Sequence, residues 1–246
     1  MRHADADPVL IFDLDETILR VNSFPLWVRF LAFARLPGLA AHRRALLTLR
    51  VLSLTARRKL HRIDHDTLLR QLQQAWRTAT QGRGDTQAAA FQARLLREVR
   101  ANLGGVLQRV ADGRLNAVLA TAAAADYAIG LGRQIGFRHV LATPADDERP
   151  ERNAGVRKRD RVLALLRDLG WDQRPRILFT DHIDDLPLMQ ACDVTCWFGD
   201  SRASTDGIRV TSCLDLDIDA LEVALDRVAA ALQCDHAAAH SKATVS

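Results

Sequence analysis

Cysteine is scarce in this sequence, with four residues in 246. That number is too small for a disulfide framework, so we expect free thiols in a reducing cytoplasm. No stretch reaches the roughly 18 uncharged apolar residues that cross a bilayer, and the first residues lack the apolar segment of a secretory signal. These absences favour a cytoplasmic protein, with attachment to the inner face of the membrane as the alternative.

Aromatic residues are also few, at 5%. Apolar residues at 48% and charged residues at 26% are nevertheless typical of globular proteins. This composition excludes a collagenous, low-complexity or largely disordered chain. The length is long for one compact domain and short for two, so we expect one main domain with an insertion.

The net charge of +4 hides a strong asymmetry along the chain. Residues 23–110 contain 16 Lys and Arg but only 4 Asp and Glu, whereas the rest of the chain contains 18 basic and 26 acidic residues. Any binding site for an anionic partner is therefore expected in the middle segment.

Short apolar runs that alternate with helical patterns predict a parallel sheet. The runs at residues 9–12, 117–120, 176–180 and 194–198 are typical of buried strands. Helical patterns cover residues 124–134 and 159–169, and each is followed by a glycine that can end a helix. This alternation predicts an α/β fold with a doubly wound parallel sheet, in which ligands bind beyond the carboxyl ends of the strands.

Between residues 23 and 110 the strand signal disappears and helical patterns replace it. We expect helices at 24–36 and 39–58, a third from Asp64 or Asp66 to Ala79, and a fourth beginning at Asp85. Apolar residues of the fourth recur every four positions, at Phe91, Leu95, Val99 and Leu103. The predicted domains are a discontinuous core (1–22 and 111–233), an inserted all-α cap (23–110) and a disordered polar tail (234–246).

Acidic residues follow two of the predicted strands. Asp13 and Asp15 come directly after the first strand, whereas Asp181 lies at the end of the third and Asp185 on the helix after it. Carboxylates held close together raise one another's pKa unless a cation or a proton lies between them. Because oxygen ligands suit Mg²⁺, four acids at one edge of a sheet predict a magnesium site.

These motifs resemble those of the haloacid dehalogenase superfamily of aspartate-nucleophile phosphohydrolases. Its first motif, Asp-x-Asp-x-Thr after an apolar strand, is matched by Asp13, Asp15 and Thr17, and its second by Thr121 at a strand end. The later motifs are matched by Lys158 near a helix start and by Asp181 and Asp185, followed by Leu186, Pro187 and Met189. The helical insertion after the first motif is similar to the class I cap of the phosphoserine-phosphatase-like branch.

The resemblance implies a role for each matched residue. Asp13 would be the nucleophile that forms an aspartyl-phosphate, and Asp15 would be the general acid and base. Mg²⁺ would be held by Asp13, the carbonyl of Asp15, Asp181 and Asp185. The residues implied to contact the phosphate are Thr17, Thr121, Ala122 and Lys158.

Two features of the chain differ from the family pattern. Glu16 stands where the first motif commonly has glycine, and Ala122 to Ala125 replace a run that is often polar or glycine-rich. A backbone N–H of Ala122 or Ala123 can still serve the phosphate.

The sequence thus predicts a Mg²⁺-dependent phosphomonoester hydrolase that acts on a small soluble phosphorylated metabolite. A lipid-phosphate phosphatase at the cytoplasmic membrane surface is the first alternative. The second is a non-catalytic binding protein that uses the basic cap. We expect no nucleic-acid partner, because few aromatic residues accompany the basic ones, and the sequence makes no prediction of oligomeric state.

Three arginines of the predicted cap, Arg43, Arg50 and Arg57, recur every seven residues among leucines. They are consistent with a solvated polar face, an entrance for an anionic substrate, or a contact with anionic lipid.

His61 and His65 lie four residues apart, a spacing that can hold a metal on one helix face. Because no second pair supports such a site, we expect both to be solvated at a helix start.

Overall fold

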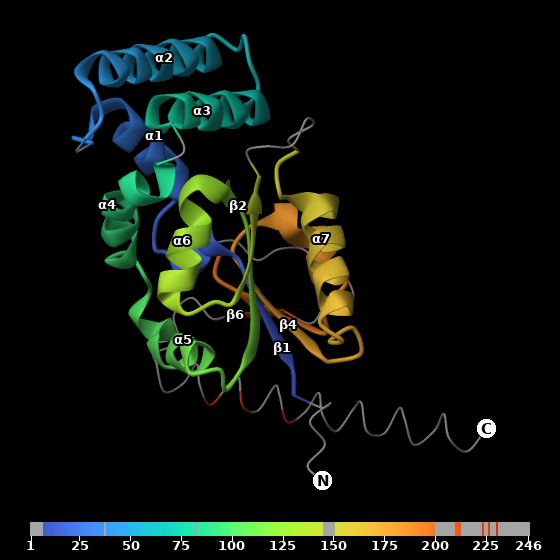
Figure 1. The fold of residues 1–246 in the computed structure, drawn as a ribbon. Helices are drawn as coiled ribbons and strands as arrows, with labels where there is room; N and C mark the ends of the chain where they lie inside the picture. Colours follow the sequence, from blue (N-terminus) through green and yellow to red (C-terminus); the bar gives the residue numbers. More distant parts are fainter. Residues whose placement is uncertain are drawn as a thin grey trace, which may run out of the picture.

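The computed structural model describes residues 7–36, 38–81, 83–144, 151–199 and 210–212, and the single positions 223, 226 and 230. Six parallel strands form one sheet in the order β3-β2-β1-β4-β5-β6 (Figure 1). They are β1 (Val9–Phe12), β2 (Asn116–Ala124), β3 (His139–Thr143), β4 (Arg176–Thr180), β5 (Val194–Trp197) and β6 (Val210–Ser212). The predicted doubly wound α/β fold is confirmed. The tail at 234–246 lies outside the described residues.

Alternating side chains of the central strand β1 pack on opposite faces of the sheet. Leu10 and Phe12 belong to a core that they share with α5 (Gly104–Ala111) and α6 (Ala125–Ile135). Val9 and Ile11 belong to a second core with α7 (Gly155–Asp168) and α8 (Leu186–Met189). A strand buried on both faces needs the continuous apolar run that the sequence has at this position.

The helices of the insertion are α1 (Ser23–Phe33), α2 (Ala41–Lys59), α3 (His65–Thr80) and α4 (Gly84–Leu96). Figure 1 shows α1, α2 and α3 stacked beyond one end of the sheet, with α2 outermost, whereas α4 lies beside α6. The cores of these helices and of one sheet face form a single apolar cluster. None of the described helices is long and apolar enough to cross a membrane.

The prediction of one long helix from Asp85 to Leu103 was wrong. Helix α4 begins at Gly84 and ends at Leu96, and a short 3-10 turn (Ala101–Leu103) separates it from α5. Between them, Val99 forms an isolated bridge with Leu19, and the N–H of Arg100 donates to the carbonyl of Ile18 at 2.8 Å. This tertiary pairing with the chain that follows β1 overrides the helical periodicity of the segment.

Other boundaries also differ from the predictions. The edge strands β3 and β6 were not predicted. The apolar run of β3 is limited to three residues between His139 and Thr143, and β6 has three residues in all. Strand β2 extends to Ala124 instead of ending at Thr121, and its register with β3 shifts between Ala120 and Ala124. Helix α1 ends at Phe33 where the backbone becomes extended at Ala34, and α7 begins four residues earlier than predicted, at Gly155.

Replacing Gly136 by alanine is expected to destabilise the fold by about 2–4 kcal/mol. Gly136 ends α6 with φ +115°, and a Cβ there would lie 2.7 Å from the Cα of Ala111. The matched control is Gly104→Ala, since Gly104 has a helical φ of −54° and open space around it. The control should be neutral or stabilising by about 0.5–1 kcal/mol. Urea unfolding of both variants measures the difference, and equal midpoints would contradict it.

Candidate active site

The loop that follows β1 directs two carboxylates into one cavity. Asp13 and Asp15 line a cavity of about 240 Å³ beyond the carboxyl end of the sheet. The loop turns at Glu16, whose φ of 55° lies in the left-handed region. This conformation favours glycine, which accounts for the glycine common at this place in the family that the sequence resembles. Arg100 holds the loop by donating to the carbonyls of Glu16 and Thr17 at 2.8 and 3.0 Å.

Lys158 contacts acidic residues that follow β1 and β4. Its Nζ donates to Asp13 Oδ1 at 2.6 Å and to Asp185 Oδ2 at 2.7 Å. Its side chain is only 2% exposed. Asp185 also accepts a hydrogen bond from the Thr180 hydroxyl at 2.7 Å. The first turn of α7 therefore places a buried cation between two carboxylates that follow different strands, β1 and β4.

Asp15 lies at the N-terminus of α1. Its Oδ1 accepts a hydrogen bond from the backbone N–H of Ser23 at 2.9 Å. The Ser23 hydroxyl is 2.6 Å from the hydroxyl of Tyr127, and both side chains are buried. A helix N-terminus presents free N–H groups and partial positive charge, which favour an anionic oxygen at this position.

Asp181 follows β4 and is oriented by the loop after β1. The Thr17 hydroxyl donates to Asp181 Oδ1 at 3.0 Å, and Thr17 is completely buried. Strands β1 and β4 are neighbours at the point where the strand order reverses, which is where doubly wound sheets bind ligands. Thr17, for which the resemblance implies a phosphate contact, thus contacts Asp181 and is absent from the cavity lining.

Another wall of the cavity is formed by the end of β2, where the register with β3 shifts. Thr121, Ala122 and Ala123 line it, and the Thr121 hydroxyl accepts from the N–H of Ala123 at 3.1 Å. Asn153, which is fully buried, donates from Nδ2 to the carbonyl of Thr121 at 3.0 Å. The Thr143 hydroxyl donates to the carbonyl of Ala122 at 2.8 Å. Asn153 was not predicted from the sequence, because its role depends on contacts between distant segments.

Burial is the largest cause of the pKa shifts of the acidic side chains in the cavity. It raises the pKa of Asp15 to about 6, and it also raises the pKa of Asp181. Burial likewise raises the pKa of Asp13 above its ordinary value, although Lys158 opposes this shift. For Lys158, burial lowers the pKa, but Asp13 and Asp185 outweigh it and raise the pKa overall. The cavity therefore disfavours the ionised forms of these carboxyls, and a further cation beside them would favour ionisation.

This donor set fits a magnesium ion. Among the described residues no three acidic, histidine or cysteine side chains form a closed metal cage. Mg²⁺ does not need one, because it is usually held by one or two carboxylates, with water and substrate phosphate completing its shell. Asp13 and Asp181 line the cavity from neighbouring strands, so two carboxylates are available there to hold the ion.

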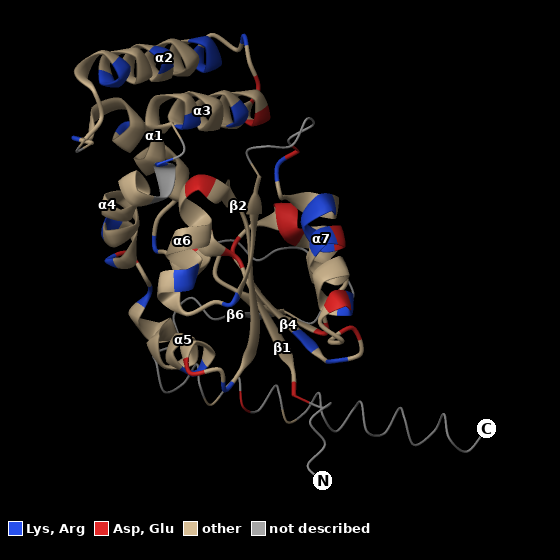
Figure 2. Ribbon diagram, in the orientation of Figure 1, with Lys and Arg blue, Asp and Glu red and all other residues tan. Residues whose placement is uncertain are grey.

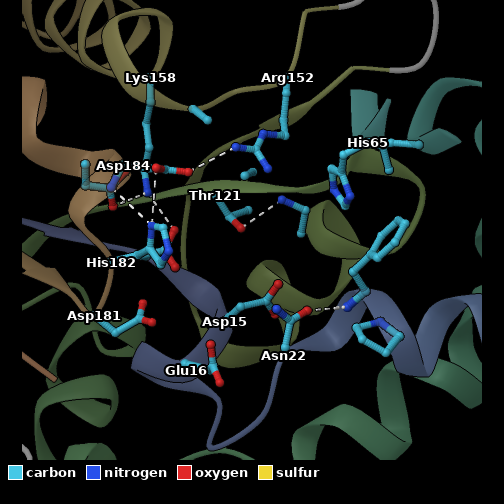
Figure 3. A pocket seen from close by; sticks show the side chains of 18 residues that line it. Asp15, Glu16, Asn22, His65, Thr121, Arg152, Lys158, Asp181, His182 and Asp184 are labelled. Atoms are coloured by element: carbon cyan, nitrogen blue, oxygen red, sulfur yellow. Dashed lines mark hydrogen bonds and ion pairs between the residues drawn. The ribbon is translucent and has the colours of Figure 1, made fainter. Parts of the chain in front are cut away.

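The side of the cavity next to α1 and α3 contains groups that the motifs did not identify. Phe24 of α1 and His65 of α3 line it, with their rings 4.6 Å apart (Figure 3). Arg152 also lines it and forms ion pairs with Asp184 at 3.2 Å and Asp66 at 3.7 Å. His65 begins α3 as expected, but it is half-buried in the cavity wall instead of solvated. Burial and Arg152 lower the pKa of His65.

The haloacid dehalogenase-like hydrolase family model matches residues 10–190, so the chain belongs to this family of hydrolases. That prediction is confirmed. No curated protein matches the sequence.

Solved structures share the fold. A protein with unknown function from Bordetella pertussis Tohama I aligns with a TM-score of 0.66 and 19% identity, over 84% of this chain and 99% of that one. A probable phosphoserine phosphatase from Vibrio cholerae aligns with a TM-score of 0.50 and 12% identity, over 79% of this chain and 58% of that one. The fold is therefore similar to that of a phosphoserine-phosphatase-like protein, as predicted.

Replacing Thr17 by valine is expected to raise the Mg²⁺ concentration needed for half-maximal activity by about 10–100-fold. Valine has nearly the same shape but cannot donate to Asp181, so the carboxylate loses the contact that orients it. A Mg²⁺ titration of phosphatase activity measures the effect. The control is Thr78→Val on α3, where the hydroxyl bonds only its own helix at Gln74. Equal Mg²⁺ dependence in both variants would contradict the prediction.

Proposed function

We propose that this hydrolase is a Mg²⁺-dependent phosphatase that cleaves phosphate monoesters through an aspartyl-phosphate at Asp13. The observation that carries the proposal is the contact of buried Lys158 with both Asp13 and Asp185 in a cavity that Asp15 also lines. A cation at this position offsets the charge of a nucleophilic carboxylate and of an arriving phosphate.

In the proposed reaction the Asp13 carboxylate attacks phosphorus while the ester P–O bond breaks. Asp15 gives its proton to the leaving oxygen, and the alcohol departs. Asp15 then takes a proton from water, which attacks the phosphorus of the aspartyl-phosphate and releases phosphate. A pKa of about 6 suits Asp15 for both transfers.

The metal and the remaining residues support the transferring group. Asp13, Asp181 and the Asp15 carbonyl would hold Mg²⁺, with Asp185 nearby, and the ion would supply positive charge to the phosphoryl oxygens. Thr121 and the N–H of Ala122 hydrogen-bond those oxygens, and Lys158 neutralises them.

The substrate that we propose is a small soluble phosphomonoester. This choice is supported by the cavity volume of about 240 Å³ and by its many charged lining residues. In this proposal residues 23–110 act as the cap, and its part over the strand ends, α1 to α3, supplies Phe24, His65 and Leu69 to the cavity. Residues 1–22 and 111–233 are the catalytic core, and a reducing cytoplasm is the proposed location.

The experiment that tests this function is hydrolysis of 4-nitrophenyl phosphate with Mg²⁺, after EDTA, and after Mg²⁺ is restored. We expect turnover with Mg²⁺, its loss in EDTA and its full return. A panel of soluble and lipid phosphates then identifies the substrate class. Turnover that persists in EDTA would contradict the metal requirement, and failure to cleave any phosphomonoester in the panel would contradict the function.

A further inference from the structure

The outermost helix of the molecule exposes large apolar side chains. On α2 and at its C-cap, Leu46, Leu49 and Leu60 are 63%, 64% and 63% exposed, and Leu52 is 47% exposed. Isolated exposed leucines are ordinary, but four on one helix form an apolar face that normally marks an interaction site.

The four leucines share one side of the helix. At 3.6 residues per turn they fall within about a third of its circumference. The opposite side of α2, formed by Leu47, Val51 and Leu54, is buried against α1 and α3. The helix therefore has an inner face that completes the insertion's core and an outer face, comprising Leu46, Leu49, Leu52 and Leu60, that the described part of the chain leaves exposed.

Positive charge borders this outer face. Arg43, Arg50 and Arg57 lie in a row directly beside it, seven residues apart, and Lys59 lies on its other border. Helix α2 contains no acidic residue. Figure 2 shows basic positions along α2 and no acidic ones, while Figure 1 shows α2 at the end of the molecule farthest from β1.

We propose that the outer face of α2 docks on an anionic lipid bilayer. A helix that lies in the membrane interface places apolar side chains at the boundary of the acyl chains and cationic side chains against lipid phosphates. The 19 residues of α2 span roughly 28 Å along the surface. The protein attaches by this face, with α2 lying along the bilayer surface, and the proposal does not depend on the reaction that the cavity performs.

The positive charge beside the outer face favours an anionic bilayer over the other possible occupants of this face. A second copy of the chain would bring its own row of Arg43, Arg50 and Arg57 against the first, and like charges repel. A nucleic acid would match the arginines but would leave the leucines exposed, with no aromatic side chain on the face to stack on bases. An anionic bilayer matches both.

The test is co-sedimentation of the full chain with vesicles of phosphatidylcholine alone and with vesicles that also contain phosphatidylglycerol. We expect binding to the anionic vesicles that weakens as salt rises, and little binding to neutral ones. The Leu46→Gln/Leu49→Gln variant should bind more than tenfold more weakly. Replacing Arg43, Arg50 and Arg57 together by glutamine should weaken binding by about a hundredfold.

The matched control replaces three arginines elsewhere by glutamine, at Arg94 and Arg97 on or just after α4 and at Arg114. It removes the same charge and should bind like the wild type. Because all the altered side chains lie at the surface, melting temperatures should stay unchanged. Equal loss in the control, equal binding to neutral vesicles, or no binding would overturn the proposal. So would a wild-type dimer in sedimentation velocity that Leu46→Gln/Leu49→Gln dissociates.

Discussion

Replacing Asp13 by asparagine is expected to lower kcat/KM for 4-nitrophenyl phosphate by at least about a thousandfold. Asparagine has nearly the same shape, but its amide cannot attack phosphorus to form an acyl phosphate. Lys158 keeps its contact with Asp185, so the variant should remain folded. Steady-state kinetics at saturating Mg²⁺ measure the loss, and circular dichroism verifies the fold.

The control for Asp13→Asn is Asp160→Asn, the same change at an exposed acid of α7. Asp160 pairs only with its neighbour Arg159 at the surface, so its replacement should leave kcat/KM within a factor of about two. If Asp13→Asn retained a tenth of the wild-type activity, Asp13 would not be the nucleophile.

Replacing Lys158 by methionine is expected to lower the free energy of unfolding by about 3–5 kcal/mol near neutral pH. Methionine fills similar space, but it leaves the buried carboxylates of Asp13 and Asp185 without their cation. Urea unfolding without metal measures the change, which does not depend on any assay of activity.

A second substitution distinguishes the effect of the unpaired buried charges from the effect of altered packing. Adding Asp185→Asn to Lys158→Met removes one of the stranded charges, so the double variant should regain about 1–2 kcal/mol. The neighbouring change Arg159→Met affects only a surface ion pair and should cost less than about 1 kcal/mol. Equal unfolding midpoints for Lys158→Met and Arg159→Met would show that the Lys158 contacts do not stabilise the fold.

Much of the fold could be predicted because its signals are local. The strands β1 and β4 are apolar runs whose side chains are buried on both faces of the sheet, and α3 has a regular apolar stripe. The edge strand β3 has no such run, and its pairing depends on β2. The end of α4 was missed because the bridge between Val99 and Leu19 joins segments 80 positions apart, and no local pattern indicates such a contact.

The predicted site residues meet for a related reason. Asp13 and Asp181 follow parallel strands and Thr121 lies near the end of a third, and the carboxyl ends of parallel strands meet at one edge of the sheet. Lys158 reaches the same place from the first turn of α7. By contrast, Arg152 and His65 enter the cavity wall from a loop and from the start of α3. Their approach depends on how the inserted helices pack over the ends of the strands, which sequence spacing does not encode.

Acid quenching of the enzyme during turnover, followed by mass spectrometry of its peptides, tests directly for the proposed aspartyl-phosphate. We expect a phosphate covalently attached to Asp13, at a level that rises in Asp15→Asn because that variant cannot activate water to release it. A phosphate on another residue, or turnover with no phosphorylated peptide in either protein, would contradict the proposed mechanism.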